Sequence, residues 1–276
     1  MSRKCVRLLA GVGLAALFSA TTPSQALAQG YLGGSLQPYA VFGGTAVTCA
    51  GASVITGDVG VSPAFLASIT GFPAPCTATG TLRGSPGSDS AKANLVTAYG
   101  FLDGLVCSST IGPDLAGLTL TQGVYCVTAA ASNLTGLLQL DAAGNPAASW
   151  TFQMSSTLIT SPGSTVDVIN GGNDCSVQWL VRSSATIDTG TTFVGNILAL
   201  TAIAMNNGAS LVGRALARNA AVTLDNNAIS FAPCAVGGGP VPTLATWALI
   251  GLLGLLGLAG FAALRGRQSL TGHPGI

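Results

Sequence analysis

The sequence contains no glutamate and a single histidine, His273, near its C-terminus. Charged residues make up 7% of the 276 residues. Without histidine, residues 29–234 cannot form a Ser-His-Asp triad, a Cys-His pair or a histidine-ligated metal site. These absences exclude the common forms of nucleophilic catalysis and histidine-metal chemistry from this segment, which we treat as the core of the protein.

The core also has few basic residues. Five positive side chains stand against nine aspartates, which gives a formal net charge of five minus nine, or −4. A nucleic-acid-binding surface needs clustered lysine and arginine to displace counterions from phosphates, so we exclude a nucleic-acid partner. The five are Arg83, Lys92, Arg182, Arg214 and Arg218.

The N-terminus has the composition of a secretory signal peptide. Basic residues in the first seven positions precede the apolar stretch 8–18, and Ala26-Leu27-Ala28 offers a small-x-small cleavage site. This order of segments is typical of signal peptides, and the apolar run is short for a membrane anchor. We therefore predict that residues 1–28 are a signal peptide and that the mature chain is exported.

The C-terminus has a second apolar segment. Residues 244–264 carry no charge and are followed by Arg265 and Arg267, a length and flank suited to a single membrane span. Basic residues remain on the cytoplasmic side, so the tail 268–276 would be cytoplasmic and the core would lie outside. The Gly/Pro-rich stretch 235–240 would be a linker ahead of this span.

Residues 241–267 combine a Pro-Thr-Leu-x-x-Trp stretch with an apolar segment and a basic cluster. This combination resembles the IPTL-CTERM type of C-terminal sorting signal of Gram-negative bacteria. The resemblance implies transient membrane anchoring, a sorting peptidase as partner, and a location at the cell surface or outside it. The tail after the basic cluster is longer than such signals usually have, so a plain single-span anchor is the alternative.

Residues 177–230 repeat at eighteen residues. Three consecutive lines, 177–194, 195–212 and 213–230, place similar residues in common columns. Such a register predicts stacked coils of a β-solenoid, in which each coil buries its apolar face only against its neighbours. A fainter copy at 150–166 fits if Pro162 is an inserted residue. The columns are Leu180, Leu198 and Leu216; Gly190, Gly208 and Asn226; and Phe193, Leu211 and Ile229.

Alternation within the coils predicts which side chains point inward. We expect the apolar phrases after Gly195 and Gly213 to form the inward ladder of the solenoid. We also expect Arg214 and Arg218 to share a solvent face opposite Leu216. The stretches 119–126 and 134–140 are predicted to be further strands.

One segment has helical periodicity instead. Apolar residues recur at spacings of three and four over 88–107, which predicts one amphipathic helix beside the solenoid. Ser88 or Asp89 is the expected N-cap. The stripe consists of Ala91, Leu95, Ala98, Leu102 and Val106.

Six cysteines remain after the signal peptide is removed with Cys5. An even number in an exported chain predicts three disulfides, although six cysteines allow fifteen connectivities. Pairing neighbours in order is the arrangement we adopt as a working guess. It joins Cys49 to Cys76, Cys107 to Cys126, and Cys175 to Cys234.

Four ordered phrases of the core resemble the microbial ice-binding-like domain family, over about residues 39–229. The resemblance implies a discontinuous parallel β-solenoid of roughly triangular section, dominated by β structure, with one long α-helix alongside. It also implies, for many members, adsorption to ice through one flat face. The phrases are Gly57–Pro63, Lys92–Tyr99, Leu115–Cys126, and Gly195–Leu200 followed by Gly213–Arg218.

The family's ice face often carries a Thr-Ala/Gly-x-Thr/Asn pattern, which Thr189-Gly190-Thr191-Thr192 matches. The repeat places 207–210 and then 225–228 below it, and 161–165 above it. The pattern degenerates from Thr/Thr to Asn/Ser to Asp/Ala down this column, and Asp225 is heavily hydrated and suits such a contact badly, so we expect weak or lost activity. The candidate ice-binding residues are Thr189, Thr191, Thr192, Asn207, Ser210, Ser161, Ser164 and Thr165. Thr45 and Thr48 are added from a further match to the pattern, which the sequence does not assign to the same face of the solenoid.

Two other functions fit a solenoid. The rod could serve as a surface adhesin or matrix component that binds glycan or a neighbouring cell. A polysaccharide lyase would use an aspartate cluster with calcium, and Asp188, Asp225, Asn206 and Asn207 lie near one predicted corner. Turn formation by these residues is the simpler interpretation. We therefore predict a non-enzymatic, monomeric core without cofactor or metal.

Overall fold

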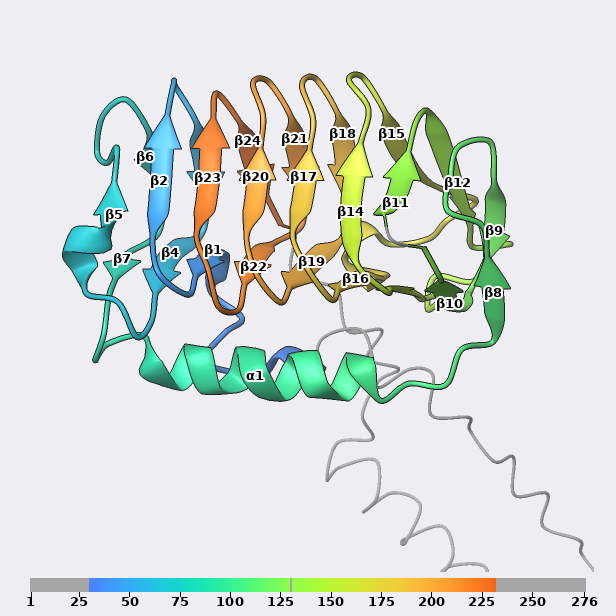
Figure 1. The fold of residues 1–276 in the computed structure, drawn as a ribbon, viewed down its shortest axis with the longest axis horizontal. Helices are drawn as coiled ribbons and strands as arrows, with labels where there is room; N and C mark the ends of the chain where they lie inside the picture. The colour runs from blue at the N-terminus through green and yellow to red at the C-terminus, as the bar shows by residue number, and fades with distance from the viewer. Residues whose placement is uncertain (1–29, 130, 232–276) are drawn as a thin grey trace, which may run out of the picture. The chain divides into compact units, whose positions relative to one another are not determined.

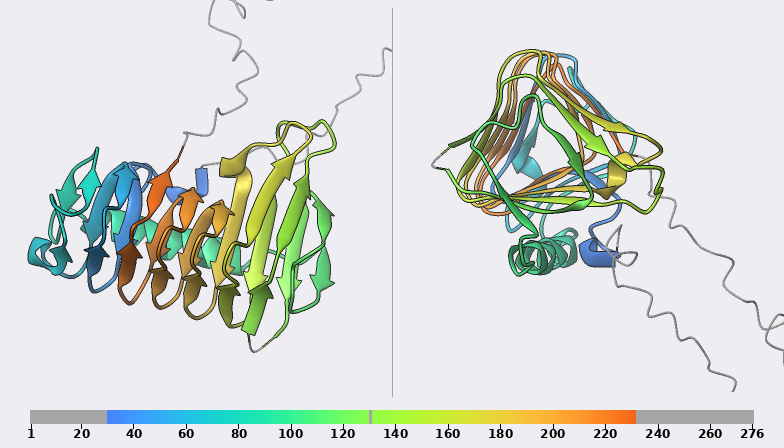
Figure 2. Two further views of the ribbon diagram at one scale, coloured as in Figure 1. Left: turned by 90° about the horizontal axis from the view of Figure 1, so that it is seen from above. Right: turned by 90° about the vertical axis from the view of Figure 1, so that its right-hand side faces the viewer.

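The computed structural model describes residues 30–129 and 131–231, which form a three-sided parallel β-solenoid with one long helix at its side (Figures 1 and 2). The predicted fold class is confirmed. Within this part of the chain, no helix is long and apolar enough to cross a membrane. The predicted signal peptide, linker, membrane span and tail lie outside the described residues.

Each wall of the solenoid is one sheet whose strands pair in parallel. Sheet A contains β7 (Leu82–Arg83), β4 (Asp58–Val61), β1 (Tyr39–Gly43), β22 (Ala215–Ala217), β19 (Asn196–Ala199), β16 (Val177–Val181), β13 (Trp150–Met154), β10 (Gly123–Val127) and β8 (Ser109–Ile111). Sheet B contains β11 (Ala131–Leu134), β14 (Thr157–Thr160), β17 (Ala185–Ile187), β20 (Ile203–Met205), β23 (Val222–Asp225), β2 (Val47–Ala50) and β5 (Ile69–Thr70). Sheet C contains β6 (Thr77–Ala78), β3 (Val54–Thr56), β24 (Ala228–Ser230), β21 (Ser210–Val212), β18 (Thr192–Val194), β15 (Thr165–Ile169), β12 (Leu137–Asp141) and β9 (Thr119–Thr121).

The order of coils in space differs from their order in sequence. The chain first builds β1 to β7 at one end, and helix α1 (Asp89–Asp103) then runs back along the solenoid (Figure 1). Strands β8 onward grow from the opposite end until the last coil meets the first. There β22 pairs with β1, β23 with β2 and β24 with β3. This junction is the discontinuity that the family resemblance implies.

Helix α1 covers the outer face of sheet A. Leu180, Leu198 and Leu216 are fully buried in a cluster with the helix residues Leu95 and Leu102. Each such leucine contributes about 1.5–3 kcal/mol by leaving water. The expectation that this column points into the solenoid is therefore wrong. The leucines alternate with inward residues along each strand, and the helix buries what would otherwise be a solvent face.

Arg214 and Arg218 lie on the same face as Leu216, because residues two apart along an extended chain point the same way. The predicted solvent face opposite Leu216 is wrong, and Arg214 is only 2% exposed. Its Nη1 donates to Asn196 Oδ1 at 3.1 Å, and its carbon Cζ lies 3.9 Å from the ring centroid of Phe231. Burial lowers the pKa of Arg214 to about 10, so the side chain is still charged at neutral pH.

The helix is shorter than predicted. It ends at Asp103, and Val106, the last residue of the predicted stripe, is 88% exposed. Ser88 occupies the N-cap position but makes no capping hydrogen bond, because its hydroxyl donates to Val61 O. Asp89 instead accepts hydrogen bonds from the hydroxyls of Ser62 and Ser85. The helix start is thus tied to the N-terminal coils.

The eighteen-residue register is confirmed for the leucine column and for Phe193, Leu211 and Ile229. Gly195 and Gly213 lie just before β19 and β22 of sheet A, and Gly213 has φ +157°. A Cβ on Gly213 would lie 1.9 Å from the carbonyl oxygen of Gly195. Only glycine therefore fits where successive coils approach most closely at this corner.

Two details of the predicted register are wrong. Pro162 is not an insertion, because Leu158 pairs with Ala185 and Thr165 with Thr192, both at the same offset. Asp225 lies opposite Asn206 rather than Asn207, since Leu224 pairs with Met205.

The two further strand predictions also need revision. The stretch 119–126 contains β9 and most of β10, which begins after Gln122. The stretch 134–140 is divided between β11 and β12, with a corner at residues 135–136. Apolar alternation continues across the corners of a solenoid, so it does not mark where one wall ends and the next begins.

An aromatic stack fills the interior. Tyr125, Phe152, Trp179 and Phe193 follow one another with ring centroids 5.6, 4.2 and 4.8 Å apart. Three of the four stand at matched positions of β10, β13 and β16. This rigid interior fixes the spacing of the coils and hence of the residues on the outer walls.

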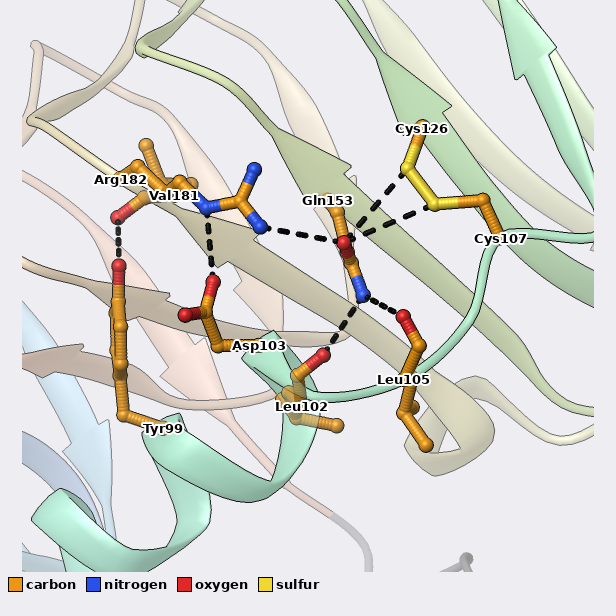
Figure 3. A network of polar contacts seen from close by, with 9 residues as sticks. All are labelled: Tyr99, Leu102, Asp103, Leu105, Cys107, Cys126, Gln153, Val181 and Arg182. Atoms are coloured by element: carbon orange, nitrogen blue, oxygen red, sulfur yellow. Dashed lines mark hydrogen bonds and ion pairs between the residues drawn. A yellow bond between two sulfur atoms is a disulfide. The ribbon is translucent and has the colours of Figure 1, made fainter.

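Two of the predicted disulfides are present among the described residues. Cys49 pairs with Cys76, and Cys107 pairs with Cys126. The second links the loop after α1 to β10, where Gln153 Nε2 also donates to the carbonyls of Leu102 and Leu105 (Figure 3). Cys175 is disulfide-bonded, whereas its predicted partner Cys234 lies outside the described residues.

Candidate functional site

The outer face of sheet B carries a continuous row of uncharged side chains, four of which are threonine. Seven coils contribute one residue each, and the register of neighbouring strands aligns them. We call this set the sheet B row. In spatial order it is Thr70, Thr48, Thr223, Ala204, Thr186, Ile159 and Asn133.

The residues on either side of Thr223, Thr48 and Thr186 are buried. Val222 and Leu224 flank Thr223, while Val47 and Cys49 flank Thr48. Thr223, Thr48 and Thr70 themselves are exposed. Because inward neighbours hold the backbone and β-branching restricts χ1, the row presents its methyl and hydroxyl groups in fixed positions.

A second row of small residues runs parallel to the first, where each coil enters sheet B. Ala46, Ala221, Ala202 and Ser184 are half-buried and stack through backbone hydrogen bonds to the strand residues of the next coil. Neither row contains a charged residue. Sheet B is thus a flat wall, and it is uncovered within the described part of the chain (Figures 1 and 2).

Charge appears at one end of the row, where Asp114 pairs with Asn133, and at the rim where sheet B meets sheet C. Asp188 and Asp225 lie there two residues after the row on their strands. Asn206 Nδ2 donates to Asp188 Oδ1 at 2.8 Å, and Asn207 Nδ2 lies 3.4 Å from Asp225 Oδ2. Hydrogen bonds from Asn206 and the Thr189 amide lower the pKa of Asp188.

These contacts bear on the calcium alternative. The aspartates accept hydrogen bonds from amide nitrogens, as Asx residues of turns do. No group of three or more metal-ligating His, Cys, Asp or Glu side chains occurs in the described residues. The turn interpretation of Asp188, Asp225, Asn206 and Asn207 is the one that their contacts support.

The candidate residues from sequence fall on different walls. Thr192, Ser210 and Thr165 align in one row on sheet C. Thr191 and Ser164 are buried at 0% and 2% exposure, so their side chains lie inside the corner. Thr189, Asn207 and Ser161 lie at the corner itself. Thr48 is on strand β2 of sheet B, and Thr45 lies two residues before that strand.

Sequence reasoning missed Thr70, Thr186 and Thr223. A one-residue insertion near 219–221 places Thr223, not Val222, opposite Ala204. A shortened turn at Asn226 then restores the register on sheet C, where Ala228 pairs with Ser210. The signal in the sequence that identifies the row is a recurring apolar-Thr-apolar triplet. It occurs as Val47-Thr48-Cys49, Ala185-Thr186-Ile187 and Val222-Thr223-Leu224.

In a comparison with known protein families, the family model described as ice-binding-like matches residues 41–230 of this chain. The chain belongs to the ice-binding-like family. The match spans all three walls and the helix. Among curated relatives, an ice-binding protein of Nostoc sp. (strain HG1) is 45% identical over 202 residues, covering 72% of this chain and 73% of the relative.

Other ice-binding-like proteins share the fold at lower identity. An ice-binding protein K3-B1 of Typhula ishikariensis is 32% identical over 62% of this chain and 77% of its own length. The crystal structure of an ice-binding protein from Antarctomyces psychrotrophicus aligns with a TM-score of 0.68 at 36% identity, covering 71% of this chain and 96% of that one. A structure from an Antarctic biological consortium gives the same TM-score at 41% identity, covering 72% and 89%.

Proposed function

We propose that this protein binds ice through the outer face of sheet B. The observation that carries the proposal is the sheet B row, which aligns threonine or another uncharged residue over seven coils. Relatives that cover most of the same fold are named ice-binding proteins. The row of sheet C that contains Thr192, Ser210 and Thr165 also runs over seven coils without a charge. It has three threonines where the sheet B row has four, and it exposes two large apolar residues, Val54 and Leu137. We therefore prefer the sheet B row.

Physical chemistry explains how such a wall recognises ice. Strands about 4.8 Å apart hold the side chains on a stiff grid, so little ordering entropy is lost on contact with a regular surface. Threonine methyls release disordered water when they are covered. The hydroxyls join an ordered water layer that continues the lattice. No catalytic step, cofactor or metal takes part.

The composition of the row sets the expected strength of binding. Four of its positions are threonine, while Ala204 lacks a hydroxyl and Ile159, 40% exposed, projects a larger apolar group. Asp225 and Asp188 at the rim are hydrated and resist close approach of a partly dehydrated surface. We therefore expect moderate activity rather than strong activity.

The direct test uses the purified mature protein. The proposal predicts faceted ice crystals and inhibition of ice recrystallisation, both lost after thermal unfolding. Crystals that grow without facets, together with unimpeded recrystallisation, would overturn the proposal. Binding on a glycan array without any effect on ice would instead favour the adhesin function.

We also propose that the chain is exported and reaches the bacterial cell surface or the medium. The support is the composition of residues 1–28 and 241–267, which fits a signal peptide and a C-terminal sorting signal or membrane anchor. A sorting peptidase would be the partner of the second segment. Mass spectrometry of the protein recovered from each cell fraction tests the processing of both segments. A cytoplasmic product with both termini intact would contradict the proposal.

A further inference from the structure

A column of polar side chains lines the inside of the corner between sheets B and C. Ser164, Thr191, Asn227 and Ser53 occupy equivalent positions, each one residue before its strand of sheet C. All four are at most 2% exposed. The coil between Thr191 and Asn227 has Ala209 at this position, which offers no side-chain hydrogen bond.

The hydroxyl members tie each coil to the one beside it. Ser164 Oγ donates to Leu134 O of the neighbouring coil and to Ser161 O of its own, both at 2.7 Å. Thr191 Oγ1 donates to Ser161 O at 3.2 Å. Leu134 O and Ser161 O each also accept a backbone amide, so the hydroxyls supply additional hydrogen bonds that link neighbouring coils at this buried corner.

Asn227 compensates for the gap at Ala209. Its Nδ2 donates to Asn206 O at 2.9 Å and to Ala209 O at 3.0 Å, both in the neighbouring coil. Its Oδ1 accepts from the Asp225 amide at 2.7 Å, and its own amide donates to Ser53 Oγ at 2.9 Å. One side chain and its amide thus join three coils.

These three coils carry the centre of the sheet B row. Asp225 and Asn206 follow Thr223 and Ala204 by two residues in their coils, and the third coil carries Thr48. Here the last coil of the chain meets the first, so no covalent connection sets their spacing. The backbone ladders of β23 with β2 and with β20 hold Thr48, Thr223 and Ala204 side by side. The hydrogen bonds of Asn227 add to these ladders at the corner, where they connect the last coil to the first.

We propose that Asn227 is a positioning residue for the ice-contact face. It touches no ice itself and acts by fixing the separation and tilt of β20, β23 and β2 at the edge of sheet B. This inference rests on the proposed ice-binding function. Loss of the side chain would leave the Asp225 amide without its acceptor and would loosen the grid on which ice recognition depends.

The test compares Asn227→Ala with Gln153→Ala, a matched variant at a different wall. Gln153 is also a buried amide whose Nε2 donates to two carbonyls, but it joins sheet A to the end of α1 (Figure 3). Both variants should lower the melting temperature. Near 0 °C, with folded protein verified by circular dichroism, Asn227→Ala should lose about three- to tenfold in thermal hysteresis activity, while Gln153→Ala keeps it.

A conservative variant supplies the rescue. Thr191 follows Gly190 as Asn227 follows Asn226, and both preceding residues have positive φ. Asn227→Thr should therefore restore donation to Asn206 O in the manner of Thr191 and recover part of the activity. Hydrogen exchange at the Asp225 amide should accelerate in Asn227→Ala and in Asn227→Thr, because both lack its acceptor.

The possible results distinguish failure of the positioning role from failure of the proposed ice-binding function. Wild-type activity in Asn227→Ala, or equal losses in Asn227→Ala and Gln153→Ala, would overturn the positioning role and leave the ice-binding proposal intact. Absence of activity in the wild-type protein would overturn both.

Discussion

Ala204 is the one position at the centre of the sheet B row that lacks a hydroxyl. It lies between Thr186 and Thr223 in register, on the same outward face. Ala204→Thr would extend the threonines without interruption from Thr70 to Thr186, and β-branched residues suit an outward strand position. We expect higher thermal hysteresis activity with stability changed by no more than about 0.5 kcal/mol.

Ala228→Thr is the control for this gain. Ala228 is exposed on sheet C between Ser210 and Val54, so the same chemical change is made on another wall. Its activity should equal that of the wild-type protein. A gain from Ala228→Thr with none from Ala204→Thr would assign the ice contact to sheet C.

Asp174 makes stability depend on pH. Partial burial, and then repulsion by Asp167, raise the pKa of Asp174. An acid with a raised pKa contributes stability that is fully present below its unfolded pKa and is lost as pH rises through its folded pKa. Asp174→Asn should therefore melt at a higher temperature than wild type at pH 7, with the difference vanishing near pH 3. Calorimetry at both values checks this, and a difference that grows on acidification would contradict it.

At the scale of elements, helix α1 is fastened to the solenoid at its C-terminal end. The disulfide Cys107–Cys126, the amide of Gln153 and the ion pair between Arg182 and Asp103 all act there (Figure 3). The ion pair, at 2.8 Å, is partly exposed and contributes little. The disulfide closes a short loop and is the main covalent restraint on the helix end.

Replacing both cysteines by serine should cost about 2–4 kcal/mol of unfolding free energy, mainly through the greater freedom of the unfolded chain. Urea unfolding measures this loss. Ice activity near 0 °C should be unchanged, because the helix covers sheet A and not sheet B. A folded double variant with reduced activity would show that the two walls are coupled.

The sequence is sufficient to predict individual coils but not their order in space. The eighteen-residue register of the leucine column and of the column formed by Phe193, Leu211 and Ile229 identifies a solenoid, because stacked coils repeat their inward and outward positions. Nothing local indicates that β22 pairs with β1, since this contact joins residues about 170 positions apart in sequence. The family resemblance, rather than the repeat, supplied the discontinuity.

The same limit explains which parts of the site were missed. The leucine column is apolar whether the interior or a helix buries it, so its pattern cannot distinguish the two. The insertion near 219–221 and the short turn at Asn226 cancel each other, so a strict eighteen-residue alignment still fits on sheet C. That alignment places Val222 opposite Ala204, and Thr223 was therefore not recognised as the outward residue. Thr48 was identified from its motif, yet its wall became known only from its pairing with Thr223.

At the scale of the whole molecule, one flat wall of a rigid rod is assigned to ice and another to the helix. The most direct test is the thermal hysteresis of Thr223→Tyr beside that of Thr192→Tyr, which places the same bulky ring on sheet B or on sheet C. Both positions are exposed, so both variants should fold. We predict that Thr223→Tyr loses most of the activity and Thr192→Tyr retains it. Full activity in Thr223→Tyr with loss in Thr192→Tyr would contradict the assignment of ice binding to sheet B.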